Sequence, residues 1–309
     1  MSLRNYLLPV YIILTAALLF SIVKVDHWDL WCILILGAAI YGIKKDSKMI
    51  AWINFLPVGI FGLALFYVIY KYANPMWDQV LSFQLKNVHH IFNWNELFNS
   101  IPGNDAWMFR VWQPDWLTAY MRWVYTYGFA LSFWICVIRA FFTKDVRKMA
   151  QYSLAGYLLQ VPFILPFYNT VFLQEVWYVQ GTPDLLTRTA TPAEQFAFTV
   201  NCFPSMHTSI AFAAIVLVLR EKSKWYRTIV IGYCSSIILS TMYLKIHWII
   251  DVIAGMLFAY LIVKLADFIV NSKVFETMMK RVEAFGARLQ RTRIENRAPS
   301  VSSEETISG

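Results

Sequence analysis

Long apolar runs alternate with short polar connections along most of the chain. Charged side chains gather in the connections and are sparse inside the runs, up to about residue 270. A helix needs about 20 residues to cross roughly 30 Å of hydrocarbon, and most of the runs approach that length. The pattern therefore predicts an all-α polytopic membrane helix bundle. We expect eight spans, at about residues 6–23, 28–43, 50–70, 117–142, 149–172, 205–219, 226–244 and 247–270.

The composition agrees with this fold class, because 58% of the residues are hydrophobic and only 15% are charged. The first run follows Arg4 and shares this basic flank with signal peptides. No small-residue cleavage pattern follows the run, and further spans come soon after it. We therefore interpret it as a true span.

The basic residues predict how the chain is oriented across the membrane. Lysines and arginines crowd every second connection between the predicted spans, and the remaining connections hold few. The crowded connections contain Lys44, Lys45 and Lys48, then Arg139, Lys144, Arg147 and Lys148, then Arg220, Lys222, Lys224 and Arg227. The positive-inside rule then predicts cytoplasmic termini and places the sparse connections outside the cell or in a lumen. The same distribution explains the net charge of +8 without a nucleic-acid partner. We expect an integral membrane protein, in the plasma membrane if the source is prokaryotic.

Three parts follow from this layout. Residues 1–49 form an N-terminal pair of spans, residues 50–270 form the membrane-embedded core, and residues 271–309 form a basic cytoplasmic tail, partly disordered. The tail alternates apolar and basic residues, as expected of an amphipathic helix on an anionic leaflet. Two external loops, 71–116 and 173–204, are too long for simple turns. They either recognise substrate or pack over the mouth of the bundle.

A histidine and an aspartate open the last predicted span. His247 and Asp251 are four residues apart, so they share one face of a helix, and Gly255 continues that face. An aspartate that accepts a proton from one ring nitrogen fixes the tautomer and makes the other nitrogen a better nucleophile. The alternative is a satisfied His–Asp pair near a membrane surface. Gly255 would let another helix approach closely.

A second histidine opens the sixth predicted span. His207 follows Pro204, Ser205 and Met206. A helix N-terminus offers free N–H groups and a positive dipole end to a phosphate, and the hydroxyl of Ser205 could add a donor. His207 is placed to protonate a leaving oxygen as a general acid. Both spans begin on the external side, so we expect His207 and His247 at the same level.

A phosphoryl group in transfer also needs cationic donors. On the external side we favour Lys245, close to His247 in sequence, and Arg122, just inside the fourth span. Arg188 and Arg110 lie in loops, where solvation is the simpler expectation. Ser240 ends the seventh span near the same level and is a further candidate donor, although bonding back to its own helix is the more common role.

The cysteines give no sign of a metal or a disulfide. Cys32, Cys136, Cys202 and Cys234 show neither paired nor metal-ligand spacing, and three of them lie in apolar runs. A free cysteine there behaves as a small hydrophobe. We therefore predict structural thiols, with no metal and no cofactor.

The segment around the first histidine resembles a signature of the type 2 phosphatidic acid phosphatase superfamily, Pro-Ser-Gly-His. Pro204, Ser205 and His207 match it, and Met206 stands in place of the glycine.

The segment around the second histidine resembles a further signature of that superfamily, Ser-Arg, five residues, His, three residues, Asp. Ser240, His247 and Asp251 match it with the correct spacing, and Thr241 stands in place of the arginine. The remaining signature, Lys, six residues, Arg-Pro, is absent, so its phosphate-clamping residues cannot be transferred to this chain.

These departures make the chain similar to the inositol phosphotransferase branch, which includes the inositol phosphorylceramide synthases. The resemblance implies a six-helix catalytic core over about residues 50–270, with His247 as nucleophile and Asp251 as its orienting carboxylate. His207 would be the acid on the leaving group and then the base that activates the acceptor. It implies no metal. The implied donor is a phospholipid or an isoprenoid-lipid phosphate, and the acceptor is water or an inositol-type or lipid hydroxyl.

Two other functions are open at this point. An intramembrane His–Asp pair can relay protons in a transporter, although internal repeats and interrupted midplane helices would be expected there. A non-catalytic membrane scaffold would keep the histidines without using them.

Overall fold

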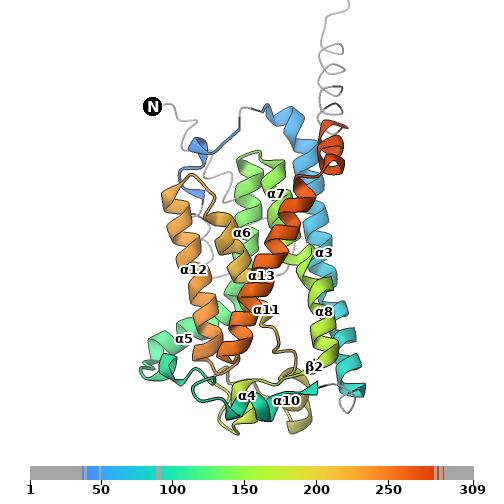
Figure 1. The fold of residues 1–309 in the computed structure, drawn as a ribbon. Coiled ribbons are helices and arrows are strands. Elements are labelled where there is room, and N and C mark those ends of the chain that lie inside the picture. The colour runs from blue at the N-terminus through green and yellow to red at the C-terminus, as the bar shows by residue number, and fades with distance from the viewer. Residues whose placement is uncertain are drawn as a thin grey trace, which may run out of the picture.

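The chain folds into a bundle of long helices with a layer of loops and short elements at one end (Figure 1). The computed structural model describes residues 37, 40–48, 50–87, 92–281, 284 and 288. The predicted span 6–23, most of 28–43 and the end of the tail lie outside the described residues. Mainly helical structure, as predicted, is confirmed for the described part.

The long helices follow the predicted spans. They run along one common direction, with α11 near the centre (Figure 1). Two π-helical turns, Val124–Gly128 and Leu154–Leu158, join α5 to α6 and α7 to α8. The helices are α3 (Trp52–Lys86), α5 (Asp115–Trp123), α6 (Phe129–Phe142), α7 (Val146–Ser153), α8 (Gln160–Thr170), α11 (Met206–Val218), α12 (Lys224–Tyr243) and α13 (Ile249–Val270).

Among the described residues, two helical stretches are long and apolar enough to cross a membrane, namely Asp115–Phe142 and Ile249–Val270. One face of α13 exposes Ile253, Leu257 and Leu261 to the surroundings, at the spacing of one helix face. An exposed aliphatic stripe of this kind is expected where lipid covers the helix. These helices agree with membrane association, and the eight spans stay a prediction.

The prediction that the helix starting near residue 50 ends at residue 70 is wrong. Helix α3 continues to Lys86 and contains Pro57 and Pro75. Hydropathy marks the length of the apolar stretch, whereas polar residues are good helix formers and can extend the same helix. The extension is anchored by Gln84, whose buried amide donates a hydrogen bond to the carbonyl of Tyr168 in α8. The first long loop thus begins after residue 86.

Helices α11 and α13 approach each other closely at the end that carries both histidines. A Cβ atom added at Gly255 would lie 2.6 Å from the carbonyl oxygen of Ser205. Only glycine allows this approach, which confirms the role expected of Gly255. The start of α11 is thereby held against the start of α13.

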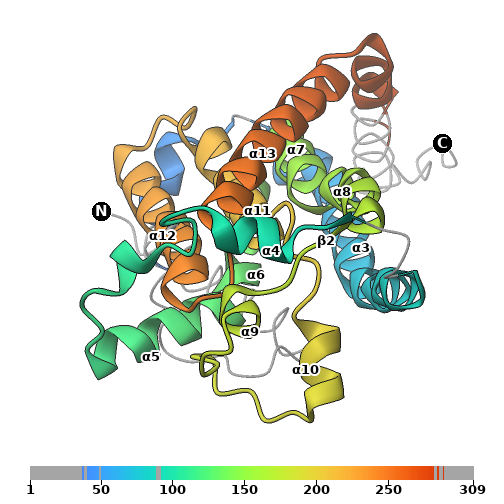
Figure 2. The ribbon, with the colours of Figure 1, turned by 60° about the horizontal axis from the view of Figure 1, so that its bottom comes forward.

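The two long loops pack together over this end of the bundle. A short parallel pair of strands, β1 (Phe92–Asn93) and β2 (Val171–Phe172), ties one loop to the other. The short elements of this layer are α4 (Asn95–Ser100), the 3₁₀ helix η3 (Trp107–Arg110), α9 (Val176–Val179) and α10 (Pro192–Phe198). Seen from this end, α4 lies beside the ends of α11 and α13, and α9 and α10 lie farther out (Figure 2). The loops form a cap over the starts of α11 and α13, which is where the sequence places its chemistry.

Candidate active site

The predicted His–Asp pair lies at the start of α13: Asp251 is in its first turn, and His247 is in the loop just before its N-cap, outside the helix in which the sequence placed it. Nδ1 of His247 lies 3.3 Å from Oδ2 of Asp251. The same oxygen accepts a 3.1 Å hydrogen bond from the backbone N–H of Trp248, the residue just before the helix. The pairing expected from the spacing is present. With Nδ1 as the protonated nitrogen, Nε2 of His247 keeps its lone pair.

Asn104, from the first loop, caps this helix. Its backbone carbonyl accepts the N–H of Ile249 at 2.8 Å, and its side-chain Oδ1 accepts the N–H of Ile250 at 3.0 Å. Its own amide donates to the carbonyl of Phe98 at 3.0 Å. The first N–H groups of a helix have no partner inside the helix. A buried loop residue supplies the acceptors here and fixes where α13 begins.

Gln174 links the same helix start to both loops. Its carbonyl accepts the indole N–H of Trp248 at 3.0 Å, and its side-chain amide bonds to Asn95 in one loop and Thr199 in the other, at 2.9 and 3.1 Å. Neither Asn104 nor Gln174 was predicted. Their partners lie far away in the chain, and no spacing pattern marks them.

His207 is positioned differently from His247. Its ring stacks on Tyr125 at 4.3 Å between centroids with planes 13° apart, and it contacts Phe129 at 4.2 Å. The two imidazole centroids are 6.3 Å apart. The structure therefore brings together the two histidines predicted to share a level. Tyr125 belongs to the π-helical turn after α5, an irregularity often found at functional sites.

Ser205 is the N-cap of α11. Its hydroxyl accepts the N–H of Thr208 at 3.3 Å and donates to the hydroxyl of Thr208 at 2.9 Å. Its backbone N–H donates to the carbonyl of Asp251 at 3.2 Å, which joins the two histidine segments directly. The hydroxyl serves the helix, and its predicted contact with phosphate stays a prediction.

Both histidines line one cavity of about 500 Å³. Glu175 and Cys202 form part of its polar wall. Its apolar wall comes from α3, α6, the π-helical turns and α10, and includes Leu81, Phe129, Ala130, Tyr157 and Phe198. The cavity thus combines polar groups next to the histidines with a largely apolar lining.

A second cavity, of about 660 Å³, is also lined by His207. Arg122 and Arg188 line it, together with Tyr125 and Thr126, which also line the first cavity. His207 therefore borders both the cavity that contains His247 and the cavity that contains two guanidinium groups.

Arg188 is not solvated, so that expectation is wrong. Its Nε donates to Asp184 at 2.7 Å, and its two terminal nitrogens donate to Glu175 at 3.1 and 2.5 Å. Burial alone would lower the pKa of Arg188, but the bonds to Glu175 and Asp184 raise it above its usual value. Burial raises the pKa of Glu175, and its bonds to Arg188 oppose that effect. The pair is a fixed ion pair at the cavity wall.

The two cations that the sequence favoured, Arg122 and Lys245, differ in their position relative to the cavities. Nε of Arg122 donates to the carbonyl of Leu185 at 2.5 Å and leaves the rest of its guanidinium beside the second cavity. Among the described residues, Lys245 lines neither cavity. Burial and the neighbouring charge of Arg110 lower the pKa of Lys245. Lys245 therefore interacts with the charges of Arg110 and Asp105 rather than with groups that line the cavities.

The hydroxyl of Ser240 is buried and donates to the carbonyl of Ile237 at 2.6 Å. This is the bonding back to the helix that the sequence favoured.

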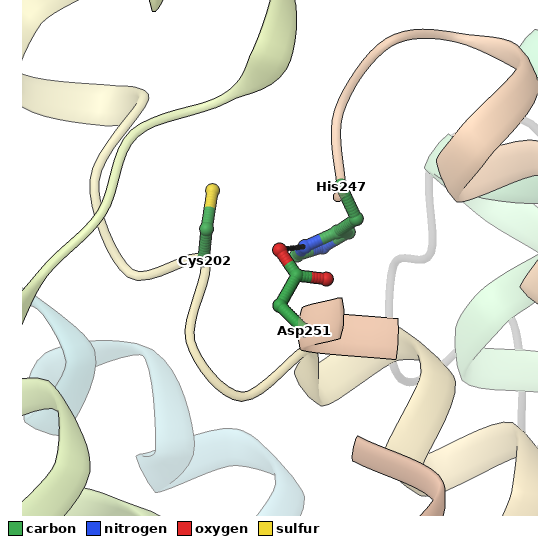
Figure 3. A group of neighbouring side chains, drawn as sticks. All are labelled: Cys202, His247 and Asp251. Atoms are coloured by element: carbon green, nitrogen blue, oxygen red, sulfur yellow. Dashed lines mark hydrogen bonds and ion pairs between the residues drawn. The ribbon is translucent and has the colours of Figure 1, made fainter. Parts of the chain in front are cut away.

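Cys202 lies beside the His–Asp pair. Its sulfur, a ring nitrogen of His247 and a carboxylate oxygen of Asp251 all lie within 4.8 Å of one another (Figure 3). Burial raises the pKa of the Cys202 thiol well above its usual value, with the nearby carboxylates adding to the effect. The thiol is therefore protonated at neutral pH. Sequence reasoning missed this contact because Cys202 and His247 are far apart in the chain.

Two histidines near helix starts line one cavity, and one of them is held by a carboxylate; His207 also lines the neighbouring cavity, which contains Arg122 and Arg188. The model of the PAP2 superfamily matches residues 107–273, which is more than half of the chain. The chain belongs to this superfamily, as predicted, and the assignment indicates an enzyme of the phosphatase or phosphotransferase type. Searches of curated proteins and of solved structures gave no match. The inositol phosphotransferase branch stays a prediction.

Proposed function

We propose that the protein is a membrane-embedded phosphatase or phosphotransferase that cleaves a lipid phosphate ester through a phosphohistidine at His247. The observation that carries this proposal is the arrangement of His247, Asp251 and His207 around one cavity. Nδ1 of His247 faces the carboxylate at 3.3 Å, and the second imidazole lies 6.3 Å away between centroids. A phosphoryl group fits between two rings at that separation.

The reaction would proceed in two displacements. Nε2 of His247 attacks phosphorus, the ester P–O bond breaks, and His207 donates its proton to the leaving oxygen. His207 then removes a proton from the acceptor hydroxyl, whose oxygen attacks phosphorus and breaks the N–P bond. Asp251 keeps the proton on Nδ1 throughout and stabilises the charge that develops on the imidazole.

Arg122 is the first cation we assign to the phosphoryl oxygens, and Arg188 is the second, provided that its guanidinium exchanges part of its pairing with Glu175 and Asp184 for the phosphate. Both line the second cavity, which His207 also lines. A guanidinium group can bind two oxygens of one phosphate through two parallel N–H bonds. They would replace the phosphate clamp of the absent family signature, Lys, six residues, Arg-Pro. Ser205, Ser240 and Lys245 remain weaker candidates, because their polar groups are engaged elsewhere or lie off the cavity wall.

The apolar wall of the first cavity supports a lipid donor, either a phospholipid or an isoprenoid-lipid phosphate. The acceptor is water in a phosphatase and an inositol-type or lipid hydroxyl in a transferase. The replacement of the family glycine and arginine by Met206 and Thr241 supports the transferase branch.

The sidedness we propose places the site outside the cell or in a lumen. The basic connections between α6 and α7 and between α11 and α12 lie at the end of the bundle opposite the loop layer that covers the histidines (Figure 1). With the positive end cytoplasmic, the site faces the other side.

The deciding experiment uses the purified full chain in detergent with EDTA. Phosphatidic acid, an isoprenoid pyrophosphate and phosphatidylinositol serve as donors, with and without a polyol acceptor. Free phosphate indicates a phosphatase, and a phosphorylated acceptor indicates a transferase. Both products must vanish in His247→Ala. If no donor gives a product that depends on His247, a transporter or scaffold function replaces this proposal.

A further inference from the structure

Cys202, His247 and Asp251 form a compact group with three different ligand atoms. The side chains come from the loop before α11, the loop before α13 and the first turn of α13 (Figure 3). Their relative exposures are 2%, 4% and 0%. The ligand atoms lie within 4.8 Å of one another.

This donor set suits zinc. Zn²⁺ prefers thiolate sulfur, imidazole nitrogen and carboxylate oxygen, at about 2.0–2.3 Å in tetrahedral geometry. Ligand atoms in such a site are about 3–4 Å apart, which follows from these bond lengths. Nδ1 of His247 and Oδ2 of Asp251 already have this separation, at 3.3 Å. The sulfur has to move by about 1 Å to complete three bonds.

The carboxylate of Asp251 has unused bonding capacity. Within the described part of the chain, its Oδ1 is buried and has no hydrogen-bond partner. A buried carboxylate without full compensation favours any cation that reaches it. The cavity lined by Cys202 and His247 gives an ion a way in and leaves room for a water as fourth ligand.

We propose that Cys202, His247 and Asp251 bind Zn²⁺ and that the bound ion inhibits the enzyme; the inhibitory part rests on the proposed function. Zinc forms bonds to the sulfur, to Nδ1 and to Oδ2. The thiol releases its proton to solvent, and the imidazole proton moves from Nδ1 to Nε2. Nε2 then has no lone pair with which to attack phosphorus. No atom changes its oxidation state.

The binding test uses the full chain, stripped with EDTA and desalted, and Co²⁺ as a spectroscopic substitute for zinc. We expect a thiolate-to-cobalt charge-transfer band and tetrahedral d–d bands, both removed by added Zn²⁺. Cys202→Ala should abolish the charge-transfer band and weaken binding by more than about tenfold, since even indirect metal partners contribute about 10- to 100-fold. Cys234→Ala, which removes a buried thiol in α12, is the matched control and should bind like the wild type.

The inhibition test compares each variant with its own metal-free rate. Zinc should inhibit the wild type, with EDTA restoring the rate, and Cys202→Ala should need more than about tenfold more zinc for half inhibition. Absence of a charge-transfer band in the wild type would overturn the site, whether or not any variant folds. Equal zinc sensitivity in wild type and Cys202→Ala would also overturn it. If the metal-free protein lacks activity but shows the cobalt band, the proposed function fails and the site stands.

Discussion

The two histidine segments begin helices at the same end of the bundle, yet they are held by different forces. His247 is fixed by polar contacts: a carboxylate on Nδ1, and a helix start capped by Asn104. His207 lies between aromatic faces, and among the described residues its ring has no hydrogen-bond partner.

The difference agrees with the two functions proposed for these histidines, His247 as nucleophile and His207 as general acid and base. A nucleophile needs one tautomer and one orientation, which hydrogen bonds provide. A general acid that later acts as a base must change its protonation state twice, and a hydrogen bond that favours one state would oppose this. Stacking fixes the plane of the His207 ring without a hydrogen bond to either ring nitrogen among the described residues. The following predictions test this division, in order of expected effect.

Loss of the nucleophile should have the largest effect. His247→Ala should lower the rate at least about 1000-fold for every phosphate donor, because no covalent intermediate can form. The rate with a lipid phosphate measures it, with unchanged helical circular dichroism as the check on folding. A variant that keeps a tenth of the activity would exclude phosphohistidine catalysis.

The loss of rate in His207→Ala should depend on the leaving group of the substrate. An alkyl ester needs a proton on its leaving oxygen, whereas a nitrophenyl ester does not. We expect a loss of about 100- to 10,000-fold with a lipid phosphate, the usual contribution of acid–base catalysis. The loss should be smaller for formation of the phosphoenzyme from the nitrophenyl ester, measured as an initial burst. Equal losses with both esters would show that His207 does not act as the acid.

Asp251→Asn tests the orientation of the nucleophile. Both present hydrogen bonds go to the same oxygen, Oδ2, so an asparagine with its amide oxygen at that position keeps them and places its N–H₂ group where Oδ1 now lies. The substitution therefore removes the negative charge that stabilises the charged imidazole, and we expect a loss of roughly 10- to 1000-fold in kcat with little change in KM. Full activity in this variant would remove Asp251 from the mechanism.

The sequence favoured both Arg122 and Lys245 as phosphate-binding cations, but only Arg122 lines a cavity beside His207. Arg122→Ala should raise KM for a phosphate donor about tenfold, the effect of losing a charged hydrogen bond worth about 1.5 kcal/mol. Lys245→Ala should change KM by less than about twofold, because an exposed charge away from the cavity contributes little. A larger effect at Lys245 than at Arg122 would place the phosphate on the other side of His207.

Much of the site could be predicted because its signals are local. The four-residue spacing of His247 and Asp251 predicted a pair on one helix face; the pair is present, but His247 lies in the loop just before the N-cap Trp248, and only Asp251 and Gly255 share a face of α13. The alternation of basic connections then puts His207 at the same level without any knowledge of packing. The close approach at Gly255 follows in the same way from its place on that face.

The contributions of the loops could not be predicted, for a physical reason. Asn104, Gln174, Arg188 and Cys202 reach the site through contacts between segments far apart in the chain, and irregular backbone has no periodicity that would reveal them. Hydropathy also failed at α3, because it reports the apolar length of a helix and not its full length.

Asn104 allows the contribution of a loop to be measured separately from the chemistry. Asn104→Ala keeps the backbone acceptor for Ile249 but removes the one for Ile250, together with the bond to Phe98. Loss of a helix cap costs about 1 kcal/mol, so we expect a lower melting temperature and a rate reduced by about fivefold. Asn104→Asp keeps an acceptor for Ile250 and should recover most of the rate, but not the bond to Phe98. If Asp restores the melting temperature and leaves the rate low, the cap stabilises the fold without positioning His247. If both variants match the wild type in rate, the orientation of His247 depends on Asp251 and not on the cap from the loop. The difference between the two histidines would then consist only of the contacts that their own rings make.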